Sequence, residues 1–362
     1  MDLALIDHHC HGVARGPLDR AGFESFLTES DRPPPEGCSA FDTLVGVALR
    51  RRCPPVLDLP ADADPDQYLA RRAELGVEEV NRRLLDQAGL EALLVDTGLA
   101  GDELADLGEL SRLSGAPAHE VLRLESVAEE VSATCSGADE FASAFAARLA
   151  ERAAGAVAVK SIIAYRHGLE FDPRPPSAAE VRRAADRWLA AGGGRLDDPV
   201  LLRHVLWAGL GTGLPLQLHA GFGDPDEDLP RCDPALLTGF LRACARAAHA
   251  VILLHCYPYH RQAAYLANVH PHVYVDLGLT IPHVGQRAAA VLAETLELAP
   301  FHKLLYSSDA YGLAELYLLA AASFREALDE VTRALGIRSA ERGRIAAMIA
   351  SGNARRVYPL PQ

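Results

Sequence analysis

The feature that most constrains the fold is a regular alternation of short apolar runs with amphipathic stretches. Apolar runs of strand length lie at residues 3–12, 91–98, 120–126, 156–165, 214–219, 250–255, 273–277 and 303–309. Helical stretches between them lie at residues 139–154, 178–190, 199–209, 234–247 and 286–296. Near-continuous apolar strands that alternate with helices are typical of a parallel sheet covered by helices on both sides.

Eight such runs, with no repeated linker or low-complexity tract, predict an α/β fold of the closed (β/α)8 TIM-barrel type. A doubly wound open sheet is the alternative. With 49% hydrophobic residues, a chain of 362 residues can bury a core of this size, so we expect one domain over residues 1–362. Residues 30–90 are too long for a simple loop and predict a helical insertion or cap after the first strand. Within it, Arg50–Arg52 could meet an anionic substrate or form a solvated helix end.

The first apolar run ends in a histidine motif. His9 and His11 are separated by one residue, and residues two apart on a strand point to the same face. Two imidazoles on one side of a strand end are arranged to share a metal ion, and histidine is the commonest ligand of zinc. A polar strand end whose histidines bond only to backbone is the alternative. The later strands decide between these two interpretations.

Four later runs also carry groups that can bind a metal. Lys160 lies in the fourth run, and His219, His255 and Asp309 end the fifth, sixth and eighth. Each alone has an ordinary explanation, as a core histidine, a helix cap or an ion-pair partner. In a TIM barrel, however, the carboxyl ends of the strands meet at one end, where the active site lies. Together with His9 and His11, these residues predict a metal site.

Charge and cysteine content limit the classes of partner. The net charge of −14 would repel nucleic acids and anionic membranes, so we expect a small-molecule substrate rather than a polyanion. Seven cysteines without a CxxC pair predict free thiols in a cytoplasmic protein, and no targeting segment precedes the first strand. Cys10 and Cys256 neighbour candidate ligands, but strand alternation points them to the opposite face, where packing is expected.

The ordered set His9-x-His11, Lys160, His219, His255 and Asp309 resembles the metal-dependent hydrolases of the amidohydrolase superfamily. Residues 159–169, 214–224, 254–259 and 352–358 are similar to its amidohydrolase-related branch, particularly the amidohydrolase-like half of glutamine-synthetase fusion proteins. The resemblance runs from the first strand to the last helix.

The resemblance implies a ligand set and a mechanism. His9, His11 and Asp309 would hold one divalent ion, most simply zinc, and His219 and His255 would hold that ion or a second one. Asp309 would take a proton from the activated water and return it to the leaving group. In relatives with two metals a carboxylated lysine bridges them, and Lys160 occupies the matching place. An unmodified ammonium is costly to bury on an apolar strand, which favours the bridged form.

Substrate contacts are expected near the fourth strand. Tyr165 and Arg166 follow that strand, and Arg166 suits a bidentate grip on a carboxylate. Arg123 and Glu125 are expected to share one face of the third strand, where they form a salt bridge or Glu125 meets a substrate amine. Asp224 is close enough in sequence to orient His219. The remaining histidines of the later loops and helices are assigned to surface or packing: His260, His270, His272 and His283.

The function that follows is hydrolysis of a C–N amide bond in a small carboxylate-bearing substrate, such as a γ-glutamyl amide. Catalysis would depend on Asp309 and His255. The same barrel serves metal-dependent decarboxylases and isomerases in related branches, and these are the alternative enzymes. A non-catalytic binding protein is the alternative outside enzymes. A homodimer that uses the insertion or the outer helices is also expected.

Overall fold

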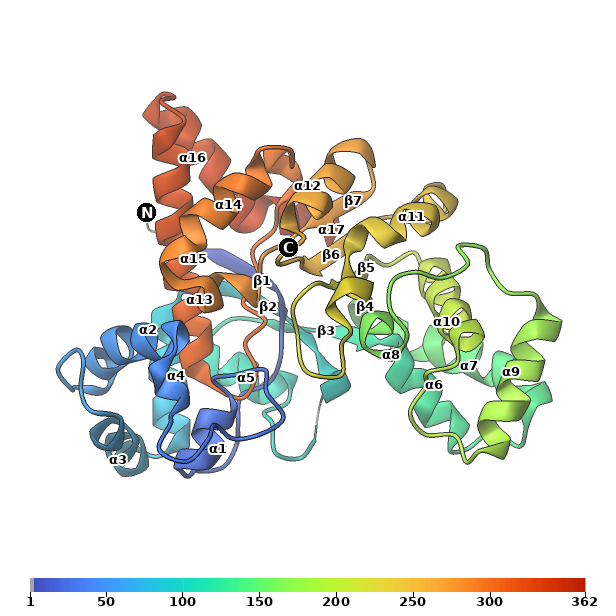
Figure 1. The fold of residues 1–362 in the computed structure, drawn as a ribbon, viewed down its shortest axis with the longest axis horizontal. Coiled ribbons are helices and arrows are strands. Elements are labelled where there is room, and N and C mark those ends of the chain that lie inside the picture. Colours follow the sequence, from blue (N-terminus) through green and yellow to red (C-terminus); the bar gives the residue numbers. More distant parts are fainter. Residues whose placement is uncertain (1–2, 100, 362) are drawn as a thin grey trace.

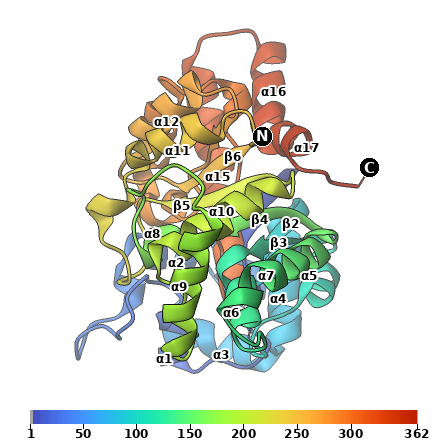
Figure 2. The same ribbon diagram turned by 90° about the vertical axis from the view of Figure 1, so that its right-hand side faces the viewer.

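The computed structural model describes residues 3–99 and 101–361. A curled sheet of seven parallel strands, paired in sequence order, lies at its centre with helices around it (Figures 1 and 2). The strands are β1 Leu5–Cys10, β2 Leu90–Asp96, β3 Ala118–Arg123, β4 Ala156–Ser161, β5 Leu216–Ala220, β6 Val251–His255 and β7 Val273–Val275. This sheet is that of an α/β fold of TIM-barrel type.

The helices are α1 Arg20–Ser25, α2 Leu44–Arg52, α3 Pro65–Leu75, α4 Val77–Ala88, α5 Leu107–Ser114, α6 Leu124–Ser132, α7 Ala138–Ala153, α8 Ile163–Arg166, α9 Ala178–Ala190, α10 Pro199–Gly211, α11 Thr238–Cys244, α12 His260–Val269, α13 Thr280–Val284, α14 Ala288–Leu296, α15 Ala314–Ala334, α16 Ser339–Ala347 and α17 Asn353–Val357. The predicted helices at 139–154, 178–190 and 199–209 are confirmed as α7, α9 and α10. The stretches at 234–247 and 286–296 each begin with a 3-10 turn before α11 and α14.

The predicted eighth strand closes the sheet without forming a regular ladder. Residues 303–309 are extended, and only Leu304 forms an isolated parallel bridge to Val275. The Leu305 amide donates to the Val275 carbonyl at 3.0 Å, and the His8 amide donates to the Tyr306 carbonyl at 3.1 Å. The segment therefore joins β7 to β1, although no strand is assigned within it.

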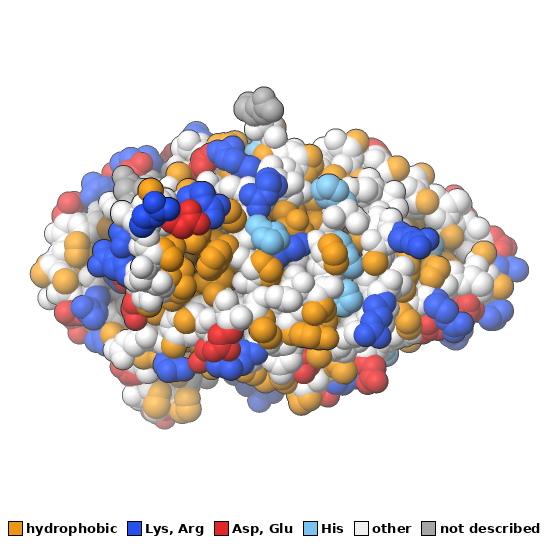
Figure 3. Space-filling model, turned by 90° about the horizontal axis from the view of Figure 1, so that it is seen from above, with side chains coloured by type: hydrophobic (Ala, Val, Ile, Leu, Met, Phe, Trp, Pro, Cys, Tyr) orange, Lys and Arg blue, Asp and Glu red, His pale blue; other side chains and the backbone are white. Residues whose placement is uncertain are grey.

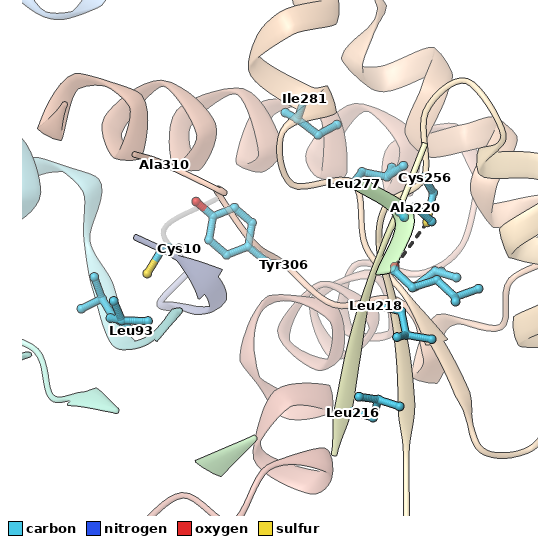
Figure 4. Packing of buried hydrophobic residues seen from close by; sticks show 14 of the residues in the cluster. Cys10, Leu93, Leu216, Leu218, Ala220, Cys256, Leu277, Ile281, Tyr306 and Ala310 are labelled. Atoms are coloured by element: carbon cyan, nitrogen blue, oxygen red, sulfur yellow. Dashed lines mark hydrogen bonds between the residues drawn. The ribbon is translucent and has the colours of Figure 1, made fainter. Parts of the chain in front are cut away.

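Side-chain alternation divides the core into two layers. On β5, Leu216 and Leu218 pack outward against the helices, whereas Gln217 and His219 face the barrel interior. Figure 4 shows part of the outer layer, where Cys10, Leu93 and Tyr306 lie together and Leu216, Leu218 and Cys256 form a second group. A smaller interior cluster contains Ile6, Leu94, Val121, Ala158, Ile252, Leu254, Val357 and Tyr358. The C-terminal segment after α17 thus packs into the barrel interior.

Two predicted strands are too long. The third strand ends at Arg123 and α6 begins at Leu124, and the fourth ends at Ser161 before α8. The Glu125 carboxylate in the first turn of α6 accepts from the Ser161 hydroxyl at 2.5 Å and from the Ile162 amide at 3.1 Å. This buried contact joins the two strand ends, and apolar periodicity alone does not reveal it.

Helices α1 to α4 lie between β1 and β2. Of these, α4 packs mainly on α15, and α3 reaches α15 where the Tyr68 hydroxyl donates to Glu315 Oε1 at 2.7 Å and Arg72 forms an ion pair with the same carboxylate (Figure 1). At the end of α2, Arg52 Nη2 lies 2.5 Å from Glu326 Oε2. The basic run at 50–52 therefore ends a helix against α15, and these arginines do not line the cavity described below.

The surface shows no large field of one charge on the face seen in Figure 3, where basic and acidic side chains are interspersed. Among the described residues, no helix combines the length and apolar character needed to cross a bilayer. All seven cysteines are unpaired, and Cys10 and Cys256 are fully buried in apolar packing. The expectation that these two thiols pack rather than bind metal agrees with these positions.

Candidate metal centre

The inward-facing residues at the carboxyl ends of the strands gather at one end of the barrel. They are His9 and His11 from the end of β1, Asp96 from β2, Arg123 from β3, Lys160 from β4, His219 from β5, His255 from β6, and Asp276 and Asp309 after the last strands. The pairing of β1 with β2 shifts register between Asp7 and Cys10. This irregularity lets the successive residues His8 and His9 both contact interior partners.

Three histidines surround the Asp309 carboxylate. His9 Nε2 lies 3.1 Å and His11 Nε2 lies 3.4 Å from Asp309 Oδ1, and His255 Nε2 lies 3.5 Å from Oδ2. The ligand atoms of His9, His255 and Asp309 all lie within 4.8 Å of one another, as do those of His9, His11 and Asp96. The structure therefore brings together four of the predicted ligands and adds Asp96.

Hydrogen bonds fix the histidine tautomers. The Asp96 carbonyl lies 3.1 Å from His11 Nδ1 and the Gln217 Oε1 lies 2.9 Å from His9 Nδ1. Both oxygens only accept, so each Nδ1 carries the proton and each Nε2 presents a lone pair to Asp309. Asp309 Oδ1 is buried without a hydrogen-bond partner in the described part of the chain. Lone pairs and a carboxylate that face one another need a cation, and this donor set suits zinc or a similar divalent ion.

Lys160 lies between His9 and a second charged group around Asp96. Its Nζ lies 3.0 Å from Asp96 Oδ2 and 2.9 Å from His9 Nε2, and Arg123 Nη2 lies 2.7 Å from Asp96 Oδ2. Burial alone would raise the pKa of Asp96, but Arg123 and Lys160 outweigh it and hold this pKa well below its usual range. Arg123 therefore pairs with Asp96, and the predicted pairing of Arg123 with Glu125 is wrong.

The protonation states agree with a cation site. Burial and the Lys160 cation lower the pKa of His9 to about 4, and burial lowers that of His255. Burial opposes ionisation of Asp309, but His255 and the other two histidines outweigh it and lower its pKa well below the usual range. Asp309 is therefore ionised and lies among the imidazoles of His9, His11 and His255. His255 and Asp309 also have left-handed backbone, with φ of 64° and 52°, a conformation that non-glycine residues rarely adopt and that clusters at functional sites.

His219 lies beside this group but faces another partner. Its ring centroid is 4.7 Å from that of His255 and 4.2 Å from that of Tyr165. Its Nε2 lies 2.5 Å from Glu227 Oε1. Glu227 therefore orients His219, and the predicted partner Asp224 does not. His219 is in neither of the two ligand groups found among the described residues, and its role as a ligand stays a prediction.

A cavity of about 520 Å³ opens above Asp309. Predicted substrate residues Tyr165 and Arg166 line it, together with Arg195, Glu29 and other residues of segment 25–31. The side chain of Arg166 is 10% exposed and lies 3.2 Å from Glu129, and its Nε and Nη1 have no hydrogen-bond partner among the described residues. Burial lowers the pKa of Arg166 from its ordinary value, and Arg195 contributes. The contact to Glu129 is made by Nη1, so Nε is the one of these two N–H groups that remains for an anionic substrate group.

Glu125 and His283 lie elsewhere than the sequence predicts. Glu125 is fully buried on Ser161 and Ile162 and does not line the cavity, so it contacts protein rather than a substrate amine. His283, assigned above to packing, does line the cavity. Its Nδ1 bonds to the Leu279 carbonyl at 2.8 Å, which leaves Nε2 as an acceptor without a partner in the described structure.

Sequence reasoning missed several residues of the site. Asp96 and Asp276 each end an apolar run, and Gln217 lies two residues before His219 on the same strand face. Strand alternation could therefore have identified all three. Glu29 and Arg195 come from loops, and no periodic signal marks them.

Comparison with known proteins agrees with this geometry. The amidohydrolase family model matches residues 6–360. A protein of Lactobacillus casei assigned to the metal-dependent hydrolases has a structure with a TM-score of 0.87 and 30% identity, over 98% of this chain and 95% of that one. Uronate isomerase from Bacillus halodurans shares the fold at a TM-score of 0.67 and 14% identity, over 98% of this chain and 93% of that one.

Among curated proteins, protein fluG of Emericella nidulans is 28% identical over 369 residues. The match covers 90% of this chain but only 42% of that protein, so this chain spans less than half the length of that relative. The resemblance seen in the sequence is thus confirmed at the level of the family. The chain belongs to the amidohydrolase family, and divalent-metal-dependent chemistry is what its family and its ligand group indicate.

Proposed function

We propose that the chain is a metal-dependent hydrolase that cleaves a C–N amide bond in a small carboxylate-bearing substrate, and that a γ-glutamyl amide is the substrate class. One observation carries the proposal. The same cavity is lined by Asp309, by its neighbours His11 and His255, and by Arg166, whose Nε has no hydrogen-bond partner among the described residues. A substrate with a carboxylate remote from its scissile bond fits both.

His9, His11, His255 and Asp309 would hold one divalent ion, for which zinc is our choice. When bound, such an ion would lower the pKa of a water molecule towards about 7 and would polarise a carbonyl oxygen. Asp309 holds and moves the proton, because its carboxylate is ionised and has an oxygen without a hydrogen-bond partner among the described residues. His9 keeps its proton on Nδ1 throughout, since Gln217 Oε1 accepts it.

Charge in the cavity supports a zwitterionic substrate end. Arg166 would bind the carboxylate, and the neighbouring Arg195 adds positive charge to that wall. Glu29 lies in the same cavity, where burial together with Asp309 and Asp224 raises its pKa to about 8. A carboxyl group in this setting would be ionised by an approaching amine cation, as at the α-carbon of a γ-glutamyl group.

We further propose that the helical segment at 30–90 is a cap within a single barrel domain spanning residues 1–362. Cavity-lining residues at 25–31 lead into this segment, which supports the proposal. A homodimer and a cytoplasmic location stay predictions of the sequence.

The test is product analysis on the metal-loaded protein. We expect γ-glutamyl-p-nitroanilide to release p-nitroaniline and glutamate, and acetyl-p-nitroanilide, which lacks the carboxylate, to react far more slowly. Release of carbon dioxide from carboxylic acids, or aldose–ketose conversion of uronates without any amide cleavage, would contradict the proposal and favour the decarboxylase or isomerase alternatives.

A further inference from the structure

Two histidines of the candidate metal centre, His9 and His255, are connected to the opposite end of the barrel by a buried polar chain. The chain runs from Tyr358, which follows the C-terminal helix α17, through Gln217 and His8. Each of these three residues is at most 3% exposed. None of these three residues lines the cavity or faces the Asp309 carboxylate directly.

The orientation of the Gln217 amide is fixed by its partners. Gln217 Nε2 donates to the His8 backbone carbonyl at 2.8 Å and to the Tyr358 hydroxyl at 3.0 Å. A carbonyl oxygen only accepts, so the amide nitrogen must face His8 and Oε1 must face His9. Oε1 lies 2.9 Å from His9 Nδ1, and therefore His9 carries its proton on Nδ1. The Lys160 ammonium, 2.9 Å from His9 Nε2, independently requires a lone pair there.

A second branch reaches His255. The Tyr358 hydroxyl accepts from Gln217 and can donate to His8 Nδ1 at 2.9 Å, which leaves the proton of His8 on Nε2. His8 Nε2 lies 2.8 Å from Asp276 Oδ2. The other oxygen, Asp276 Oδ1, accepts from the backbone amide of His255 at 2.5 Å. This bond holds His255 at the point where its backbone is left-handed.

We propose that Gln217 and Tyr358 are positioning residues that keep His9 in the Nδ1-protonated form and so present its Nε2 to the metal. Asp276 holds the backbone of His255 in place through its hydrogen bond to the His255 amide. The C-terminal segment thereby supports the metal site from the barrel interior, without contacting the metal itself. The inference rests on the metal centre of the proposed function and adds the residues that orient its ligands.

The first experiment measures the tautomer of His9 in the wild-type protein. In metal-free wild-type protein labelled with ¹⁵N-histidine, the ring nitrogen shifts of His9, identified by their loss in His9→Asn, should show a proton on Nδ1. A proton on Nε2 would overturn the inference. This measurement is independent of activity and of bound metal.

The second experiment measures zinc affinity by competition with a chromophoric chelator. We expect Gln217→Leu and Tyr358→Phe to bind zinc about 10–100-fold more weakly than the wild type. Tyr306→Phe is the matched control, because Tyr306 is also buried but its hydroxyl has no hydrogen-bond partner in the described chain (Figure 4). Wild-type affinity in both test variants would overturn the inference. A wild-type protein that binds no zinc would instead contradict the proposed function, while the tautomer of His9 still decides the positioning role.

Discussion

The two sides of the barrel's carboxyl end differ in whether their charges are already balanced. On the side of β2 to β4, Asp96 lies within 3.0 Å of the cationic nitrogens of both Arg123 and Lys160. On the side of β1 and residues 303–309, Asp309 faces the unprotonated Nε2 atoms of His9 and His11. Asp96 is thus paired with two cations, whereas Asp309 forms no ion pair with Lys or Arg among the described residues.

This difference bears on the number of metal ions. In the sequence, the cost of burying an ammonium favours a carboxylated Lys160 that bridges two ions. In the structure, the ion pair with Asp96 offsets that cost, because a buried charge is tolerated when it is paired. We therefore expect one ion on the Asp309 side. The ion would bind the Nε2 lone pair of His9, which Lys160 contacts in this structure. Lys160 would then keep its ion pair with Asp96.

The largest expected effect comes from the side that lacks a cation. Asp309→Asn should fold and should lower the turnover of a γ-glutamyl amide by about 10²–10⁴-fold, because an amide cannot accept the proton of the attacking water. Steady-state kinetics and circular dichroism measure the two effects. Asp86→Asn, on the exposed face of α4, is the control and should keep full activity. A fully active Asp309→Asn would refute the proton-shuttle role.

The next effect concerns substrate binding. Arg166→Gln should raise KM for the γ-glutamyl substrate about 10–100-fold, since a charge-assisted hydrogen bond contributes about 1.5–3 kcal/mol. The slow reaction with acetyl-p-nitroanilide should not change. Arg261→Gln removes an arginine that is 55% exposed and should leave KM unaltered. Equal losses on both substrates would mean that Arg166 does not bind the carboxylate.

The balanced side gives a sharper test of the metal count. Lys160→Met should retain one ion per chain, because Lys160 is not a ligand in the one-ion arrangement, and turnover should fall by about tenfold because Asp96 keeps only Arg123 as a cationic partner. Elemental analysis measures the ion. Lys303→Met, at the second lysine of the sequence, is the control. Loss of half the metal in Lys160→Met alone would instead indicate a bridging, carboxylated lysine.

The smallest effect is on stability. The pKa of Glu29 is raised to about 8 from 4.5, chiefly by burial, so the metal-free folded state keeps a proton that the unfolded chain has lost. The contribution of Glu29 to wild-type stability should therefore fall as the pH rises from 4.5 to about 8. Glu29→Gln removes this loss, and its Tm should exceed that of the wild type by about 2–4 °C at pH ~8 and not at pH ~4.5. The exposed Glu36→Gln should show no such difference. An equal gain at both pH values would show that the effect is not ionisation of Glu29.

Most of the fold could be predicted because alternation of apolar strands and helices is a local signal. Seven of the eight predicted strands are present, and the eighth, at 303–309, occupies its place as an extended segment. The ends of β3 and β4 could not be predicted, because the contact of Glu125 with Ser161 that ends them joins residues distant in sequence. Helices such as α12 and α13 lacked a pattern long enough to stand out from a loop.

The candidate ligands of the site could be predicted from the sequence, but the residues that pair with the other charged and polar side chains could not. His9, His11, His255 and Asp309 converge as strand ends must in a barrel. Which charge pairs with which depends on the three-dimensional arrangement. Arg123 therefore contacts Asp96 instead of Glu125, and His219 contacts Glu227 instead of Asp224.

The metal content per chain, measured by elemental analysis together with intact mass on protein purified without chelator, tests the central claim most directly. We predict about one divalent ion per chain and the mass of an unmodified Lys160. Two ions with the extra mass of a carboxyl group would contradict the one-ion arrangement. A protein that holds no metal even after reconstitution with zinc would contradict the metal centre itself.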